Sequence, residues 1–307
     1  MRRHLLAIAD LSIEELRALL DLAVDLKAAW RSGTAGKPLA GRILAMLFEK
    51  PSLRTRVSFE VAMHHLGGHA MYIAPQEVEL GRRETVPDAA RVLSRYVDAI
   101  VLRTFGHEHV VELAEHATVP VINGLSDREH PCQALADLLT VREHRGALGG
   151  LRLAWVGDGN NVCNSLMLAA AKTGMRAAIA CPPAYRPNPE VVAAAQDAAR
   201  LTGGEVTIHA DPREAVRCAD VVYTDVWISM GQERESAERR AAFAGFQVNA
   251  QLMRLAGDAV VMHCLPAHRG EEIAEEVLEG PDSIVWDQAE NRVHAQKAVL
   301  HQLLRGA

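Results

Sequence analysis

The chain has 307 residues, of which 49% are hydrophobic and 23% are charged, and its formal net charge is -6 at pH 7. This length exceeds what one hydrophobic core usually supports, so we expect two domains that each bury a core. The composition excludes a largely disordered or fibrous chain. The negative charge argues against a nucleic-acid partner, because phosphate backbones are bound through clustered positive charge.

The N-terminal segment and the cysteines indicate a cytoplasmic protein. The apolar stretch before Asp10 is too short for a signal peptide or a membrane span. The five cysteines form no C-x-x-C pair and have no paired histidines at metal-ligand spacing. We therefore expect no structural metal, and we expect most of the cysteines to be small core residues. Cys264 is not expected to be a simple core residue, because it lies in the segment His263 to Pro266 at the end of a predicted strand.

Helical and strand patterns alternate along the first half of the chain. A capping box at Ser12 to Glu15 opens an amphipathic helix that ends near Gly33. The elements predicted after it are a strand at 42–48, a helix through 57–66, a strand at 70–73, a helix at about 88–96, strands at 99–102 and 119–122, and a helix after Pro131. Strands separated by helices predict a parallel sheet.

A second series of the same kind follows a charged, glycine-rich break at 145–150. Its predicted strands lie at 151–156, 177–181, 205–209, 220–223 and 259–263, with helices between them. We therefore expect an α/β fold of two doubly wound parallel-sheet domains, at 1–145 and 146–291. A last helix at 292–307 is expected to pack back on the first domain.

Polar residues gather just after the predicted strands of the first half, where open parallel sheets bind ligands. Ser52-Leu53-Arg54-Thr55-Arg56 combines a helix N-terminus with two hydroxyls and two guanidiniums, a composition that suits phosphate. The alternative is a capped helix with surface arginines. Arg103 follows a second strand, and His130-Pro131-Cys132-Gln133 follows a third. A histidine taken alone at such a place is more often a surface residue.

The second half has three comparable segments. Gly157 to Asn161 resembles half of a dinucleotide-binding fingerprint, but Val162 stands where its third glycine would be. This argues against a dinucleotide-dependent oxidoreductase. The segments Asp225 to Gly231 and His263 to Pro266 also follow predicted strands, and a loop position there favours function over packing.

Together these motifs resemble the aspartate/ornithine carbamoyltransferase family over nearly the whole chain. The family signature for carbamoyl phosphate, S-x-R-T-R, H-P-x-Q and the arginine between them, is present at Ser52 to Arg56, His130 to Gln133 and Arg103. The ornithine-type marks are the pair Asn160-Asn161, the D-x-W-x-S-M-G segment from Asp225 to Gly231, and H-C-L-P at His263 to Pro266. The aspartate-specific relatives have H-P-L-P at the last of these places.

The resemblance implies an active site in the cleft between the two domains, without a cofactor or a metal. The first domain would bind carbamoyl phosphate and the second L-ornithine, whose side-chain amine would take the carbamoyl group to give citrulline and phosphate. The implied carbamoyl-phosphate ligands are Ser52, Leu53, Arg54, Thr55, Glu79, Arg103, His130, Gln133, Cys264, Leu265 and Arg292. The resemblance also implies a homotrimer or a multiple of trimers.

Roles within this set follow from the same resemblance. Thr55, Arg103 and His130 would stabilise the carbonyl oxygen as it gains charge, and Cys264 and Leu265 would lie beside the reacting amine. The ornithine ligands would be Asn161 for the carboxylate, Asp225 for the α-amino group, and Ser229 with Met230 for the aliphatic stem.

One position departs from the family pattern. The chain reads Val78-Glu79-Leu80-Gly81 where ornithine-specific relatives usually carry a glutamine that can reach a neighbouring subunit's site. A carboxylate beside a phosphate is unfavourable unless it is paired or protonated, so we expect Glu79 to pair with a cation such as Arg82 or Arg83.

Two further readings of the motifs stay open. A carbamoyltransferase acting on putrescine or an acylated ornithine would keep the phosphate half unchanged, although the Ser229-Met230-Gly231 segment weighs against it. A non-catalytic paralogue would keep the fold and the phosphate site, but the motifs are intact in both halves.

Overall fold

The computed structural model describes residues 4–305. Its contacts divide the chain into two compact units, one containing residues up to 139 together with those from 290 onward, the other containing residues 140–289. The prediction that the chain has no signal peptide depends partly on the first three residues, which lie outside the described part. So do the last two residues of the predicted helix 292–307. No described helix is both long and apolar enough to span a membrane.

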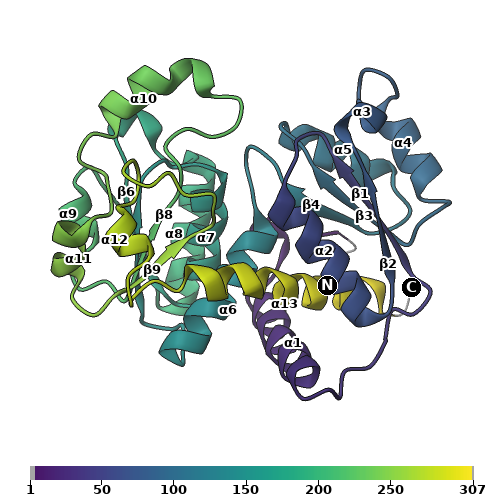
Figure 1. Ribbon diagram of the computed structural model, residues 1–307, viewed down its shortest axis with the longest axis horizontal. Helices are drawn as coiled ribbons and strands as arrows, with labels where there is room; N and C mark the ends of the chain where they lie inside the picture. The colour runs from purple at the N-terminus through teal and green to yellow at the C-terminus, as the bar shows by residue number, and fades with distance from the viewer. Residues whose placement is uncertain (1–3, 306–307) are drawn as a thin grey trace. The chain divides into compact units, whose positions relative to one another are not determined.

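The first unit is built on a four-stranded parallel sheet (Figure 1). Its strands are β1 (Ile43–Phe48), β2 (His69–Ile73), β3 (Ala99–Arg103) and β4 (Val121–Leu125), in the order β2-β1-β3-β4. Its helices are α1 (Ile13–Arg31), α2 (Leu53–Leu66), α3 (Pro75–Val78), α4 (Val86–Leu93) and α5 (His107–His116). In the register of β1 and β3, Phe48 lies opposite Arg103, so both strands end at the same level.

Burial on both faces explains why β1 is a nearly continuous apolar run. Ala45 and Leu47 pack in a cluster with Val86 of α4 and Val110 of α5 on one face. Phe48, on the alternate face, is 0% exposed. Burying a side chain of that size contributes about 1.5–3 kcal/mol. The sheet therefore has helices on both faces and holds its strand ends at fixed positions.

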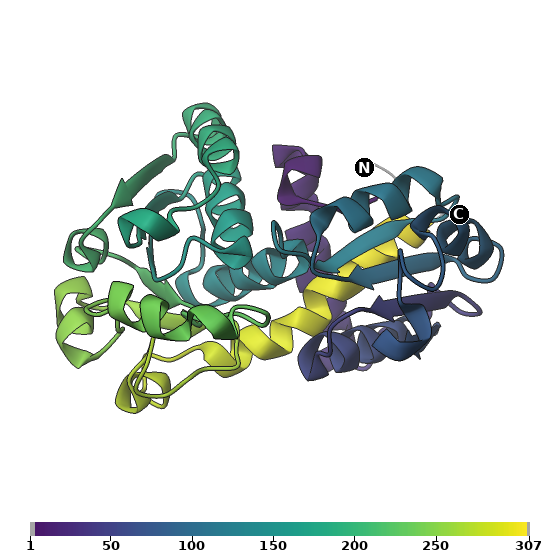
Figure 2. The same ribbon diagram turned by 90° about the horizontal axis from the view of Figure 1, so that it is seen from above.

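Two helices, α6 (Pro131–Arg145) and α13 (Val285–Leu304), have residues in both units. Within the first unit, α13 lies beside α1. Lys27 Nζ donates to Asn291 Oδ1 at 2.7 Å, and Lys297 Nζ donates to the carbonyl oxygen of Leu26 at 2.8 Å. Figure 2 shows the yellow ribbon of α13 running past the purple ribbon of α1.

The second unit contains a five-stranded parallel sheet. Its strands are β5 (Arg152–Val156), β6 (Arg176–Ala180), β7 (Glu205–His209), β8 (Val221–Thr224) and β9 (Val260–His263), in the order β7-β6-β5-β8-β9. Its helices are α7 (Asn161–Lys172), α8 (Pro189–Thr202), α9 (Pro212–Ala215), α10 (Ser236–Ala242), α11 (Ala250–Ala256) and α12 (Glu275–Leu278). Its core includes Val156, Val222, Phe243 and Val261.

The predicted fold class of two doubly wound parallel-sheet domains is confirmed, and so is the capping box of α1. Ser12 Oγ accepts from Glu15 N at 3.1 Å, and Glu15 Oε2 accepts from Ser12 N at 2.9 Å. Several predicted element boundaries were off by one or more residues. The last helix begins at Val285 rather than 292, β4 lies at Val121–Leu125 rather than 119–122, and the fourth helix begins at Val86 rather than 88.

These errors have local causes. The first turn of α13 carries Trp286, which is 54% exposed and breaks the amphipathic spacing. The helix α5 was not predicted, although Val110, Leu113 and Ala114 recur at helical spacing and are all buried. That spacing was the signal that could have identified it.

Candidate active site

Each sheet has one place where its strand order reverses, and the predicted site residues follow the strands there. In the first sheet the reversal lies between β1, which is followed by Ser52, and β3, which ends at Arg103. In the second sheet it lies between β5, followed by Gly157, and β8, followed by Asp225. Open α/β sheets bind ligands at the carboxyl ends of the strands at such reversals. Each unit therefore presents its motifs where a ligand is expected.

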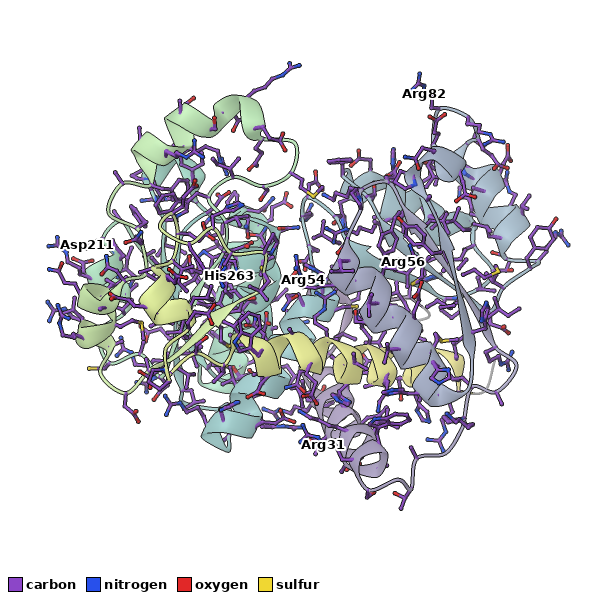
Figure 3. All side chains as sticks on the ribbon, viewed as in Figure 1. Arg31, Arg54, Arg56, Arg82, Asp211 and His263 are labelled. Carbon is purple, nitrogen blue, oxygen red and sulfur yellow. The ribbon has the colours of Figure 1, made fainter. Side chains whose placement is uncertain are left out.

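The N-terminus of α2 forms the first part of the candidate phosphate site. Ser52 Oγ accepts from Thr55 N at 3.2 Å and donates to Thr55 Oγ1 at 3.1 Å. The Leu53 side chain is 76% exposed, so this residue would offer a ligand its backbone N–H. Arg54 lies in the same turn and is half-buried (Figure 3). First-turn N–H groups, hydroxyls and a guanidinium form an arrangement that binds phosphate.

A second guanidinium reaches this turn from α13. Arg292 is 3% exposed and donates to Thr55 Oγ1 at 3.2 Å and to Gln133 Oε1 at 2.6 Å. Gln133 Nε2 in turn donates to Asp137 Oδ1 at 2.8 Å, one turn further along α6. Side chains that hold one another in place lose less entropy when a ligand binds. The structure thus places four of the predicted ligands, Ser52 included, in one hydrogen-bonded network.

His130 lies in the positive field of the same arginines. It is 4% exposed, and burial lowers its pKa well below the usual 6.5, with Arg292 and then Arg103 lowering it further. The imidazole is therefore neutral near pH 7 and can donate a hydrogen bond without adding a charge. Arg103, at the end of β3, is itself only 8% exposed. A neutral donor among buried guanidiniums suits an oxygen that gains negative charge during a reaction.

Sequence reasoning missed Lys50. This lysine is 8% exposed, and its Nζ lies 4.4 Å from the centroid of the Phe105 ring. Burial, followed by the charge of Arg103, lowers its pKa to about 8. Its place at the end of β1, directly before the Pro51-Ser52 turn, was the signal that could have identified it. Lys50 strengthens the positive potential of this strand end.

Glu79 lies apart from this network. It follows α3 in the left-handed region, with φ 36°, and its side chain is exposed. Its carbonyl oxygen accepts from the backbone N of Arg82 at 3.0 Å and of Arg83 at 2.9 Å. No ion pair joins its carboxylate to either arginine in the described part of the chain. The predicted pairing therefore stays a prediction.

In the second unit, Asp225 is the centre of the polar cluster. It is 5% exposed, and its two carboxylate oxygens accept from Asn160 Nδ2 at 2.8 Å and from Cys264 Sγ at 3.0 Å. Asn160 is also the N-cap of α7, where its Oδ1 accepts from Val162 N. The structure thus brings Asp225 and Cys264 together. Asn160 makes the contact to Asp225, whereas Asn161, the predicted ligand, lies in the first turn of α7.

The segment that carries Ser229 and Met230 is more exposed. Met230 is 50% exposed and Ser229 is half-buried. Within the described part of the chain, this segment forms local hydrogen bonds: Ser229 N donates to Gln232 Oε1 at 3.0 Å, and Gly231 N donates to Glu233 Oε1 at 3.0 Å. Few long-range bonds make such a segment inexpensive to move.

Arg239 of α10 holds the residues just before that segment in place. It is 3% exposed, forms an ion pair with Asp158, and donates through Nε to the carbonyl oxygen of Trp227 at 2.7 Å. Its guanidinium also lies over the Tyr185 ring, 4.6 Å from the centroid. Burial raises the pKa of Asp158 to about 6, an effect that Arg239 opposes. The sequence did not identify Arg239, because it stands in a charged run that reads as a solvated helix face.

Asp225, His263 and Cys264 each offer a ligand atom within 4.8 Å of the others, a set that could hold a metal ion. Both ring nitrogens of His263 are already hydrogen-bonded, Nε2 to Glu272 and Nδ1 to the backbone of Leu265. A metal at His263 would have to break one of these two hydrogen bonds. This donor set therefore fits a hydrogen-bonded turn better than a resident ion.

Two family models match the chain in successive blocks. The one described as "Aspartate/ornithine carbamoyltransferase, carbamoyl-P binding domain" matches residues 3–143. The one described as "Aspartate/ornithine carbamoyltransferase, Asp/Orn binding domain" matches residues 149–303. The chain belongs to the aspartate/ornithine carbamoyltransferase family. The protein is therefore an enzyme of the carbamoyltransferase class.

Individual relatives resemble the chain over almost all of its length. An ornithine carbamoyltransferase of Methanoculleus marisnigri is 57% identical over 100% of this chain and 98% of its own. An anabolic ornithine carbamoyltransferase of Pyrococcus furiosus is 53% identical over 99% of this chain and 97% of its own. A solved structure of ornithine carbamoyltransferase from Pyrococcus furiosus matches with a TM-score of 0.97 at 53% identity, over 99% of this chain and 97% of that one.

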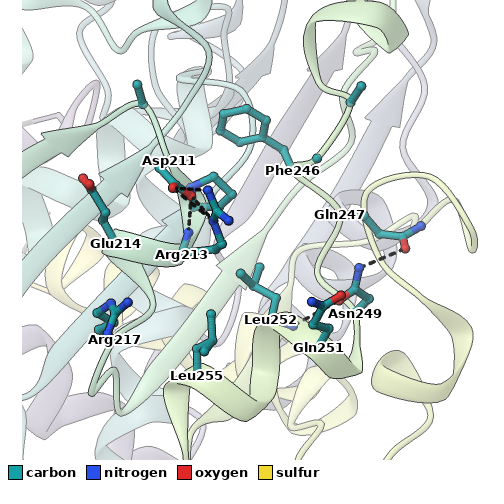
Figure 4. Close-up of a pocket in the computed structure, with 14 residues that line it drawn as sticks. Asp211, Arg213, Glu214, Arg217, Phe246, Gln247, Asn249, Gln251, Leu252 and Leu255 are labelled. Carbon is teal, nitrogen blue, oxygen red and sulfur yellow. Dashed lines mark hydrogen bonds and ion pairs between the residues drawn. The ribbon is translucent and has the colours of Figure 1, made fainter.

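A surface hollow of about 960 Å³ lies elsewhere in the second unit of this carbamoyltransferase, between α9 and α11 (Figure 4). Its rim carries Asp211 and Arg213, which pair with each other at 2.7 Å. Its lining includes Arg217, Phe246 and Leu252 and none of the described residues that the sequence assigns to substrates. The motifs, and not this hollow, therefore define the candidate active site.

Proposed function

We propose that the protein is an ornithine carbamoyltransferase, which transfers the carbamoyl group of carbamoyl phosphate to the side-chain amine of L-ornithine and releases L-citrulline and phosphate. The observation that carries the choice of ornithine is the buried carboxylate of Asp225 at the strand reversal of the second sheet. A carboxylate there attracts an α-ammonium group but repels a dicarboxylate such as aspartate. The relatives named ornithine carbamoyltransferase support the same choice.

Carbamoyl phosphate binds to the first unit. Its phosphate lies on the N-terminus of α2, where Ser52, Thr55 and the N–H of Leu53 donate to it, and Arg54 and Arg103 bind it through charge-assisted bonds. Arg292 adds a third guanidinium that its bonds to Thr55 and Gln133 already hold in place.

The reaction places negative charge on the carbonyl oxygen when the amine attacks the carbonyl carbon. Thr55, Arg103 and the neutral His130 donate to that oxygen. Fixed donors aimed at a developing charge stabilise the transition state more than the bound substrate. One such donor is worth about 100-fold to 1000-fold in kcat.

The nucleophile is the neutral amine of ornithine. Its pKa in water lies near the roughly 10.4 of a lysine side chain, so about one molecule in a thousand is neutral at pH 7. Selecting that form costs on the order of 4 kcal/mol. The leaving phosphate accepts the amine proton, which removes the need for a protein base.

Ornithine binds to the second unit. Asp225 binds the α-amino group, Asn161 binds the carboxylate, and Ser229 with Met230 contacts the aliphatic stem. Cys264 and the carbonyl group of Leu265 then lie beside the side-chain amine. Carbamoyl phosphate binds first, and ornithine closes the exposed Ser229–Gly231 segment, which shields the reactive anhydride from water.

Three further features belong to the proposal. The functional domains are residues 1–145 with the last helix, and residues 146–291. The enzyme is a homotrimer or a multiple of trimers, in which Glu79 stands where related chains carry a glutamine that reaches a neighbouring site. The enzyme works in the cytoplasm, which five free cysteines support.

The test is a citrulline assay with carbamoyl phosphate and a panel of amines. We expect turnover with L-ornithine that exceeds turnover with aspartate, putrescine and Nα-acetylornithine by at least about 100-fold, because only ornithine combines an α-ammonium and an α-carboxylate with a side-chain amine. Comparable turnover with putrescine or acetylornithine would reject ornithine as the substrate. Binding of carbamoyl phosphate without turnover of any amine would indicate a non-catalytic paralogue.

A further inference from the structure

A buried acid–imidazole pair lies directly behind the turn that carries Cys264 and Leu265. Glu272 is 0% exposed and His263 is 1% exposed. Glu272 Oε1 accepts from His263 Nε2 at 3.1 Å and also from the backbone N of His268 at 2.6 Å. The other ring nitrogen, His263 Nδ1, accepts from the backbone N of Leu265 at 2.8 Å. One imidazole ring therefore connects a buried carboxylate to the backbone of the turn.

The partners of this ring determine where its proton lies. An ionised carboxylate only accepts, so Nε2 carries the proton that it donates to Glu272. Nδ1 then keeps its lone pair and can accept from Leu265 N–H. If the proton moved to Nδ1, two donors would face each other at Leu265 and the hydrogen bond would be lost. Glu272 thus selects the tautomer of His263 that can hold the turn.

The turn needs this support because its backbone conformation is unusual. Leu265 has a φ of 59°, in the left-handed region that residues with a side chain seldom adopt. The residue before it, Cys264, donates through Sγ to Asp225 Oδ1 at 3.0 Å. The backbone of His263 is also held, since its N donates to Gln288 Oε1 at 3.0 Å. Releasing Leu265 would therefore leave the backbone after Cys264, including the Leu265 carbonyl, without a fixed direction.

We propose that Glu272 is a positioning residue for carbamoyl transfer: through the tautomer of His263 it holds Cys264 and Leu265 where the reacting amine needs them. Glu272 touches no substrate and acts only through His263. The inference rests on the proposed function, because it assigns a purpose to the Cys264-Leu265 turn of that same site. In many protein sites a carboxylate that accepts from one ring nitrogen of a histidine fixes the tautomer and the orientation of the ring in the same way.

Two substitutions of His263 separate the two hydrogen bonds of its ring. In His263→Asn the side-chain oxygen stands close to the place of Nδ1, so it can still accept from Leu265 N–H, whereas the bond to Glu272 is lost. In His263→Gln the amide reaches the place of Nε2 and can still donate to Glu272, whereas Leu265 loses its acceptor. The matched control is His268→Asn, which changes a largely exposed side chain on the other side of Glu272.

We expect opposite losses in the two variants. His263→Asn should unfold more easily, because Glu272 is left buried without its imidazole, yet lose less than about threefold in kcat. His263→Gln should keep more of its stability and lose about 10-fold to 100-fold in kcat. The KM for carbamoyl phosphate should stay unchanged in His263→Asn, which keeps the acceptor of Leu265 N–H, and His268→Asn should resemble the wild type in stability and in rate.

The tautomer itself can be observed by 15N NMR of the histidine ring, with the His263 signals assigned from their absence in His263→Asn. We expect a protonated Nε2 and an unprotonated Nδ1 in the wild type, and a shift toward the other tautomer in Glu272→Met, which has no oxygen to accept from Nε2, together with a lower kcat. A wild-type ring protonated at Nδ1, or kcat losses that simply follow the melting temperature across the series, would overturn the inference. Absence of citrulline formation by the wild type would instead refute the proposed function, and the tautomer result would stand independently of it.

Discussion

The two units build their halves of the proposed site in different ways. In the first unit, Thr55, Gln133 and Arg292 are at most 3% exposed, and Arg292 donates to the other two, so the protein itself holds these phosphate ligands in place. In the second unit, Asp225 is buried but Met230 is 50% exposed, and the segment around it has mainly local bonds. A compact dianion is best bound by charges already in place, whereas a flexible amino acid can be enclosed by a segment that moves.

The strongest test of this difference is to remove the fixed charges of the first unit. We expect Arg54→Ala and Arg103→Ala each to lower kcat/KM for carbamoyl phosphate by about 1000-fold, because each removes charge-assisted bonds to the phosphate or the developing oxyanion. Steady-state kinetics measure the loss, and thermal unfolding shows whether the fold is kept. Arg91→Ala is the control, since Arg91 forms an exposed ion pair with Asp88. Near-normal kcat/KM in either variant would show that its residue is misassigned.

The corresponding change in the second unit is Asp225→Asn. The amide keeps the size of the side chain but removes the charge that would bind the α-ammonium group, so we expect the KM for ornithine to rise by about 100-fold. Binding of carbamoyl phosphate, measured by calorimetry, should be unchanged. If carbamoyl phosphate binding fell as much as ornithine binding, the assignment of one substrate to each unit would be wrong.

Substitution of Arg239 tests whether the Ser229–Gly231 segment needs a fixed anchor just before it. In Arg239→Met the carbonyl of Trp227 and the carboxylate of Asp158 lose their buried partner, so we expect a loss of about 3–5 kcal/mol in the free energy of unfolding. At a temperature where the variant is folded, the KM for ornithine should rise by about 10-fold. Arg239→Lys should recover part of the stability but little of the KM, because lysine lacks the planar donor pair.

Movement of the segment itself can be followed by limited proteolysis. Trypsin should cleave the free enzyme after Arg234, which is exposed just beyond Gly231. We expect carbamoyl phosphate with a non-reacting ornithine analogue to slow this cleavage by about fivefold, and carbamoyl phosphate alone to leave it unchanged. Product-inhibition kinetics indicating random order, with equal cleavage under all conditions, would contradict closure by ornithine.

The smallest effect that we expect concerns the buried imidazole of the phosphate half. His130 has a pKa well below 6.5 in the folded protein, so between its folded pKa and the usual 6.5 only the unfolded state binds the proton. The contribution of neutral His130 to the free energy of unfolding is therefore fully present above pH 6.5 and is lost as the pH falls below 6.5. Urea unfolding from pH 7 to pH 5 should show a steeper loss in the wild type than in His130→Asn. An NMR titration of His130 centred near pH 6.5 would contradict the prediction.

Much of the fold could be predicted from local patterns. Apolar runs such as Ile43–Phe48 and the capping box at Ser12 depend on residues a few positions apart, so the sequence shows them directly. The predicted phosphate residues Ser52 and Thr55 lie together for the same reason. The predicted start of α13 was wrong, because one exposed tryptophan in its first turn obscured the helical spacing.

The residues that sequence reasoning missed all depend on contacts between distant segments. Lys50 gains its lowered pKa from burial beside Arg103. Asn160 was part of a predicted motif, but its contact to Asp225 across 65 positions was not foreseen. Arg239 reaches Asp158 across 81 positions from a run that looks like a solvated surface. Burial and long-range pairing change what a side chain does without changing the sequence around it.

The alternation of strands and helices and the polar motifs after the strands could be predicted from the sequence alone, because both depend on spacing along the chain, and the resemblance of those motifs indicated the family. The strand orders β2-β1-β3-β4 and β7-β6-β5-β8-β9, which place those motifs at the two reversals, became known only from the three-dimensional fold. The same holds for the hydrogen bonds that join Glu272 to His263 behind the Cys264-Leu265 turn. Strand order and long-range hydrogen bonds depend on which segments meet in space. The free energy of the whole fold determines this, and no local sequence pattern encodes it.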